Sequence, residues 1–98
     1  MAKTVVFSKR SRNRLEKLLA YLENEWSLKV KSEFIEKLDR CVLQISKHPE
    51  SCPVSEEFPG LYKFVVTKQT TLYYRIEEKE IQVITFFDNR QDPKKLKP

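Results

Sequence analysis

The sequence predicts an α+β fold in which a pair of helices packs on one face of a mainly antiparallel sheet. Three observations lead to this prediction. Two segments between residues 9 and 47 carry apolar residues at helical spacing, a short β-branched run precedes them, and three runs of β-branched and aromatic residues follow them. The predicted order is strand, two helices and three strands. We expect a single domain over residues 1–98, with residues 94–98 as a flexible tail.

The first strand is expected at Lys3–Phe7, where the sequence reads KTVVF. Ser8 follows, and its hydroxyl can cap a helix that begins at Lys9. The apolar residues of this helix are spaced i, i+3, i+4, i+7 and i+11, which predicts one core-facing stripe: Leu15, Leu18, Leu19, Leu22 and Trp26.

A second helix is predicted after Ser27, which can cap it. Its apolar residues again follow steps of three and four: Val30, Phe34, Leu38, Cys41, Val42 and Ile45. The helix should end near Lys47, because the residue before a proline disfavours helical backbone and the sequence continues His48-Pro49. A proline-containing loop then leads to a strand at Leu61–Val66 and a polar turn at Thr67–Thr71.

The last two strands are predicted to form a hairpin, with apolar runs at 72–76 and 81–87 joined by Glu77-Glu78-Lys79-Glu80. With Glu78 and Lys79 as the loop, the antiparallel register sets Ile76 opposite Ile81, Arg75 opposite Gln82, Tyr74 opposite Val83 and Tyr73 opposite Ile84. Strand alternation then predicts a core face of Leu72, Tyr74, Ile76, Ile81 and Val83. The opposite face, with Tyr73, Arg75, Gln82, Ile84 and Phe86, is a candidate working surface.

Composition excludes several classes of protein. The chain is 40% hydrophobic, its longest apolar run near the start is Val5–Phe7, and no run reaches the ~20 residues of a membrane span. We therefore expect a cytoplasmic protein, with Cys41 and Cys52 as reduced thiols. Gly-rich phosphate loops, zinc-binding cysteine pairs and catalytic triads are missing, and the single histidine, His48, is expected at a helix end. No metal and no small-molecule cofactor is expected.

The formal net charge is +5, and it is concentrated at the start of the chain. Residues 1–14 contain five basic residues and no acidic one: Lys3, Lys9, Arg10, Arg12 and Arg14. Such asymmetry favours a nucleic acid or an acidic protein segment as partner, although a solvated basic surface is the simpler interpretation.

The order of elements and two motifs resemble the RelE/ParE superfamily of toxins from bacterial type II toxin-antitoxin systems. The motifs are Tyr74-Arg75-Ile76 on the penultimate strand and Asp88-Asn89-Arg90-Gln91-Asp92-Pro93 after the last strand. The resemblance implies a RelE/ParE-like β-α-α-β-β-β fold. It also implies a growth-inhibiting toxin of the plasmid stabilisation type, which a cognate antitoxin neutralises.

Two targets are open within this resemblance. RelE-like toxins cleave mRNA on the ribosome, which would make Arg75, Arg90 and Tyr73 the catalytic residues of an endoribonuclease. The residues expected to bind nucleic acid or target are then Lys63, Lys68, Phe86, Lys94 and Lys95. That branch often has a strand arginine near Thr71 and a histidine or tyrosine after the last strand, which this chain lacks.

ParE-like toxins poison DNA gyrase and need only a binding surface, so enzymatic activity is an open question. In either branch we expect Lys9, Arg10 and Arg12 to bind an acidic segment of the antitoxin. A function of another class is a nontoxic binding module that regulates transcription together with its partner.

Overall fold

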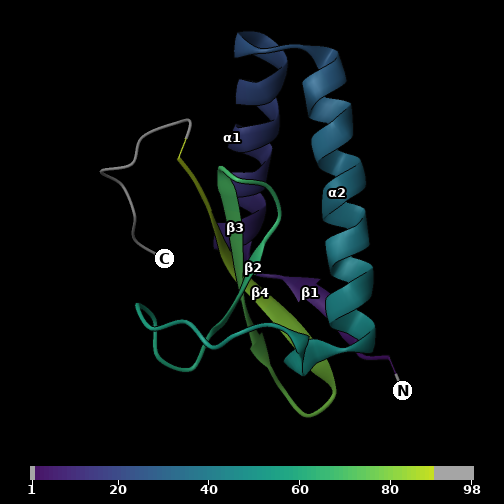
Figure 1. The fold of residues 1–98 in the computed structure, drawn as a ribbon, viewed down its shortest axis with the longest axis vertical. Helices are drawn as coiled ribbons and strands as arrows, with labels where there is room; N and C mark the ends of the chain where they lie inside the picture. The colour runs from purple at the N-terminus through teal and green to yellow at the C-terminus, as the bar shows by residue number, and fades with distance from the viewer. Residues whose placement is uncertain (1, 90–98) are drawn as a thin grey trace.

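The computed structural model describes residues 2–89, so the predicted tail at 94–98 lies outside the described part. Its elements are β1 (Thr4–Phe7), α1 (Lys9–Glu25), α2 (Leu28–Lys47), a 3-10 turn η1 (Pro49–Ser51), β2 (Tyr62–Val65), β3 (Thr70–Ile76) and β4 (Glu80–Asp88). The strands form one sheet in the order β1-β4-β3-β2 (Figure 1). β1 runs parallel to β4 and the other pairs are antiparallel. The predicted α+β fold is confirmed.

The predicted helix ends are also confirmed. The Ser8 side chain accepts a hydrogen bond from the Ser11 backbone N–H at 3.1 Å, and Ser27 accepts one from Val30 at 3.1 Å. Each cap satisfies a backbone donor that would otherwise lack a helical partner, which stabilises a helix by ~1 kcal/mol. The second helix ends at Lys47 with His48 as its C-cap.

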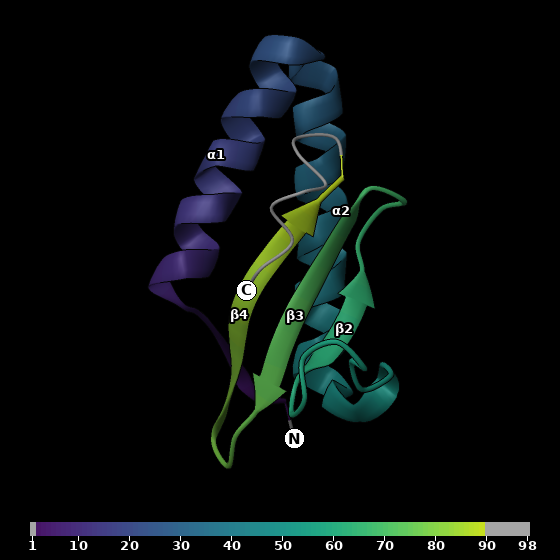
Figure 2. The same ribbon diagram turned by 90° about the vertical axis from the view of Figure 1, so that its left-hand side faces the viewer.

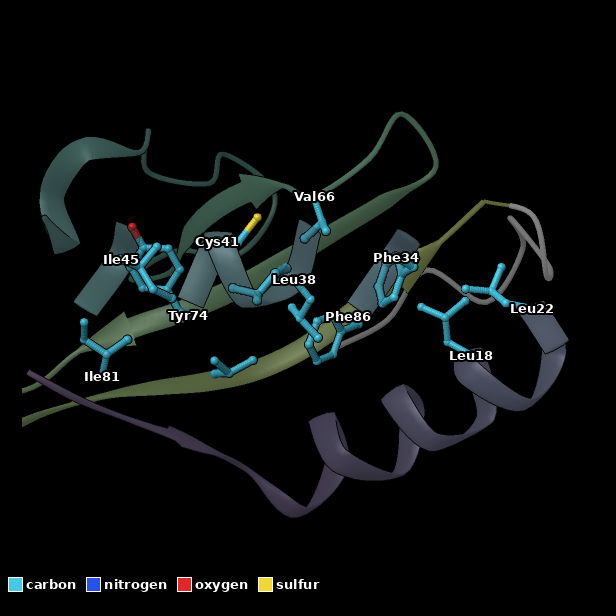
Figure 3. Close-up of a cluster of buried hydrophobic side chains, with 12 residues drawn as sticks. Leu18, Leu22, Phe34, Leu38, Cys41, Ile45, Val66, Tyr74, Ile81 and Phe86 are labelled. Atoms are coloured by element: carbon cyan, nitrogen blue, oxygen red, sulfur yellow. The ribbon is translucent and has the colours of Figure 1, made fainter. Parts of the chain in front are cut away.

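The hydrophobic core lies between the two helices and one face of the sheet. Figure 3 shows side chains from both helices meeting those of β3 and β4. The buried members are Leu18, Leu22, Phe34, Leu38, Cys41, Ile45, Val66, Leu72, Tyr74, Ile81, Val83 and Phe86. The predicted helix stripes therefore reach the core, with one exception. Trp26 is 57% exposed, because α1 ends at Glu25 and the tip of the helical hairpin extends beyond the sheet (Figure 1).

A β-bulge changes the predicted register of the hairpin. Ile76 pairs with Ile81, Arg75 with Gln82 and Tyr74 with Val83, as predicted. The register then shifts between Tyr73 and Tyr74, and Tyr73 pairs with Thr85 rather than Ile84, so this part of the prediction was wrong. An extra residue on one strand moves all later side chains to the other face.

The shift decides where two phenylalanines lie. Phe86 pairs with Leu72 and is buried in the core, with 3% of its surface exposed, so its prediction as a working-surface residue was wrong. Phe87 lies on the opposite face instead, where it packs with Tyr73.

One face of the sheet is covered by helix and the other is not. In Figure 2, α2 lies behind β2, β3 and β4, and α1 lies beside β4. Within residues 2–89 no helix crosses in front of the opposite face, which we call the open face. None of the described helices is long and apolar enough to cross a membrane.

Candidate functional site

The centre of the open face is a small apolar cluster that is separate from the main core. It contains Leu61, Tyr73 and Phe87, with Phe58 and Ile84 packed against them, and we call it the open-face cluster. The Phe58 ring meets the Tyr73 ring edge to face, with centroids 5.1 Å apart, and Tyr73 meets Phe87 in the same way at 5.4 Å. Edge-to-face aromatic pairs add ~0.5–1.5 kcal/mol to the burial of the rings. The cluster is therefore closely packed.

The loop before β2 carries Phe58 onto this cluster. Ser55 is buried, and its side-chain oxygen accepts a hydrogen bond from the Phe58 backbone N–H at 3.1 Å. The Ser55 N–H donates to the Leu61 carbonyl at 2.7 Å, which closes the loop. Gly60 has φ of 86°, a backbone conformation that is strained for other residues. The loop is thus held at both ends and presents Phe58 to the sheet.

Tyr73 is a predicted catalytic residue, and the structure buries it in the open-face cluster with 4% of its surface exposed. Its hydroxyl donates a hydrogen bond to Glu57 Oε2 at 3.1 Å. Burial, and then the hydrogen bond and charge of Glu57, raise the pKa of the Tyr73 phenol to about 12. The hydroxyl proton is therefore held in the hydrogen bond to Glu57.

Arg75, the second predicted catalytic residue, is exposed near the hairpin loop. Its Nε donates to Glu77 Oε2 at 3.1 Å, and its terminal nitrogen donates to Gln82 Oε1 at 3.1 Å. Both partners lie on or directly beside the same hairpin as Arg75. The geometry suits a surface cation, with part of its charge offset by Glu77.

The other predicted target-binding residues are spread over the molecule. Lys63 pairs with Tyr73 across β2 and β3 and so joins Tyr73 and Arg75 on the open face. Lys68 lies in the turn between β2 and β3, beyond the ends of both strands, and Phe86 is in the core. Arg90, Lys94 and Lys95 lie outside the described residues. The three residues expected to bind antitoxin, Lys9, Arg10 and Arg12, are all exposed in the first turns of α1.

Arg14 was not predicted as a site residue, and the structure places it at the junction of α1 and the bulge of β4. Its terminal nitrogen donates to Thr85 Oγ1 at 3.0 Å and to the Phe86 carbonyl at 3.3 Å. Its guanidinium carbon lies 5.3 Å from the centroid of the Phe87 ring, a cation-π distance. Burial, and then the charge of Arg10, lower the pKa of Arg14. The spacing of four residues between Arg10 and Arg14 was visible in the sequence, but the bulge that receives Arg14 was not.

Comparison with known proteins places this geometry in a family. The family model described as the ParE toxin of the type II toxin-antitoxin system parDE matches residues 5–93, most of the chain. The chain belongs to the ParE toxin family. No curated protein matches the sequence.

Solved structures support the fold of this ParE family member. A chain of the chromosomal ParDE toxin-antitoxin system from P. aeruginosa is 11% identical, with a TM-score of 0.74 over 89% of this chain and 96% of that one. A YoeB/ParE toxin from Agrobacterium tumefaciens is 14% identical, with a TM-score of 0.65 over 87% and 96%.

The RelBE2 toxin-antitoxin complex from Mycobacterium tuberculosis has a chain that is 17% identical, with a TM-score of 0.61 over 90% of this chain and 99% of that one. At such low identity the likeness shows the fold alone. It does not distinguish the RelE-like target from the ParE-like target.

Proposed function

We propose that this ParE family member is a growth-inhibiting toxin that a cognate antitoxin neutralises, and that it acts in the cytoplasm by binding DNA gyrase rather than by cleaving mRNA. The observation that carries the choice of target is the burial of Tyr73, whose hydroxyl donates a hydrogen bond to Glu57.

RNA cleavage through the 2′-hydroxyl needs a group that removes a proton and cations at the developing phosphate charge. The Tyr73 hydroxyl already donates to Glu57, and Arg75 already donates to Glu77 and Gln82. An aromatic side chain that stacks a base must expose its face. Tyr73 and Phe87 are both buried, so neither ring is free for that purpose. These features favour a toxin that works by binding.

The open face suits recognition of a protein. Phe58, the partly exposed ring of the cluster, shares this face with the cations Lys63 and Arg75, and interface anchors are enriched in aromatic residues and arginine. Val65 on β2 adds an apolar residue that is 60% exposed. A target protein such as gyrase can bury this surface without any catalytic step.

The antitoxin is proposed to contact the exposed cations Lys9, Arg10 and Arg12 at the start of α1 through an acidic segment. The first turn of α1 contains no acidic residue. Cations at a helix N-terminus are disfavoured by the helix dipole, so an acidic partner would relieve this cost as well as neutralise the charge.

Induced expression of the gene in a bacterial host tests the proposal. We expect growth arrest, rescue by the adjacent small open reading frame, induction of the DNA-damage response and intact mRNA. New RNA ends in phase with codons would identify the ribosome as target. Unimpeded growth at verified soluble expression would instead support the nontoxic module that regulates transcription.

Variants locate the working surface in the same assay. If gyrase is the target, Arg75→Ala and Arg90→Ala should weaken toxicity without any RNA being cut in either variant. If mRNA cleavage is the activity, each loss should lower the rate by ~10²–10³-fold. Arg40→Ala, an exposed change on α2, is the matched control and should leave toxicity unchanged. Full toxicity of the Arg75→Ala, Arg90→Ala double variant would show that the working surface lies elsewhere.

A further inference from the structure

Within residues 2–89, the guanidinium of Arg14 uses only part of its capacity for hydrogen bonds. One terminal nitrogen of its guanidinium makes both hydrogen bonds, to Thr85 and to the Phe86 carbonyl. A guanidinium carries five N–H donors in a planar fork, and most of those of Arg14 have no hydrogen-bond acceptor among the described residues. Within residues 2–89 the ion pairs are Lys31–Glu23 and Arg75–Glu77, and neither involves Arg14.

The surroundings of Arg14 favour the binding of a counter-ion. The side chain is half-buried, and Arg10, one helical turn earlier, is the charged group that acts on it. Two cations on one side of a helix repel each other, and burial weakens the screening of that repulsion by water. An anion placed between them would remove this cost and use the free donors of Arg14.

We infer that Arg10 and Arg14 form a carboxylate-binding site beside the Phe87 ring, and that it takes an acidic side chain of an amphipathic antitoxin segment. This inference rests on the proposed function, because it names the antitoxin as the partner. It extends the expected antitoxin surface from the exposed start of α1 to the edge of the open-face cluster.

The neighbours of the site favour a carboxylate of a peptide over a phosphate of a nucleic acid. Phe87 is only 8% exposed, and Arg14 already lies over its ring, so no ring face is offered to a base. Ile84 and Phe58 instead pack against the same apolar cluster as Phe87, over which Arg14 lies. An acidic side chain followed by an aliphatic one matches this arrangement, since the fork of an arginine fits a carboxylate with two parallel hydrogen bonds.

The site is pre-organised by the start of α1. The Ser8 backbone N–H donates to the Val83 carbonyl at 2.9 Å, and its hydroxyl donates to the Ile84 carbonyl at 2.8 Å. Together with Arg14, these bonds tie the helix to the bulge of β4. A ligand that binds here meets an Arg14 side chain that is already held in place, which lowers the entropic cost of binding.

Side-chain NMR on the purified protein tests this directly. The probe is the peptide acetyl-Glu-Leu-Glu-Leu-amide, titrated at constant ionic strength, and the signal is the Nε–Hε cross-peak of Arg14. We expect a saturable shift of that peak. The Arg40 peak reports an exposed arginine on α2 and should move much less. The glutamine version of the peptide should produce no saturable shift.

Variants separate the carboxylate site from general charge attraction. Arg14→Gln should weaken peptide binding at least tenfold, which corresponds to ~1.4 kcal/mol, and Arg40→Gln should not change it. If Arg14→Gln fails to fold, Arg14→Lys keeps the charge but loses the fork and should weaken binding by less. The titration of the unaltered protein remains decisive in either case.

Two outcomes would overturn the inference. Equal shifts at Arg14 and Arg40 would mean that the peptide only senses net charge. Saturation of the Arg14 peak by a single-stranded oligonucleotide at lower concentration than by the peptide would assign the site to phosphate. Growth arrest is a separate readout, so a protein that binds the peptide without being toxic would contradict only the proposed function.

Discussion

Substitution of Phe86 tests the β-bulge, which determines which side chains lie on the open face. Uninterrupted strand alternation puts this side chain on the open face, whereas the structure buries it with 3% exposed, and its ring centroid lies 6.0 Å from that of Phe7. Removing a buried phenylalanine ring costs ~3–5 kcal/mol through lost burial and the cavity that remains. We therefore expect Phe86→Ala to lower the free energy of unfolding by about that amount.

Urea unfolding followed by circular dichroism measures this change. Domains of this size have total stabilities of ~5–15 kcal/mol, so the variant should shift the midpoint strongly or be partly unfolded in buffer. Phe86→Leu then gives a readable loss of roughly 1 kcal/mol. Arg75→Ala, an exposed change on the same hairpin, should stay within ~0.5 kcal/mol. A loss below ~1 kcal/mol for Phe86→Ala would refute the burial of Phe86.

Three further predictions use other parts of the fold. Tyr73 has a raised pKa, so the folded state holds this proton more tightly, and the free energy of unfolding should fall as pH rises from about 10 towards 12. Tyr73→Phe should make that fall less steep when unfolding is measured against pH. An unchanged slope in the variant would contradict this prediction. Burial, followed by the charge of Cys52, raises the pKa of Cys41 to about 11. At pH 8 a thiol reagent should therefore modify the partly exposed Cys52 quickly and the buried Cys41 only after unfolding. Equal rates of modification of the two cysteines in the folded protein would contradict this prediction. Ser27→Ala should destabilise the protein by ~1 kcal/mol, since it removes the α2 cap, whereas the exposed mid-helix change Ser32→Ala should not.

Local chemistry explains why so much of the fold could be predicted. The caps at Ser8 and Ser27 and the end of α2 before Pro49 each depend on residues within a few positions. The helix stripes follow from spacing alone. The exposure of Trp26 was not predicted, because Trp26 continues the apolar stripe one step past the end of the helix, where no sheet lies beneath it.

The candidate site was harder to predict because long-range contacts build it. The bulge at Ile84 and Thr85 carries no glycine or other local signal. It is held instead by Ser8 and Arg14, which reach it from more than seventy positions earlier in the chain. Once alternation fails there, Phe86 and Phe87 exchange faces. Likewise, the burial of Tyr73 depends on Phe58, which a separate loop brings over the sheet.

The most direct test of the proposed target uses purified protein in two assays side by side. One contains DNA gyrase, relaxed plasmid and ATP, and the other contains translating ribosomes with a defined mRNA. We expect inhibition of supercoiling that saturates at a fixed ratio of toxin to gyrase, with the mRNA intact. Cleavage of the mRNA in phase with its codons, with supercoiling unaffected, would contradict the proposal that this toxin acts by binding gyrase.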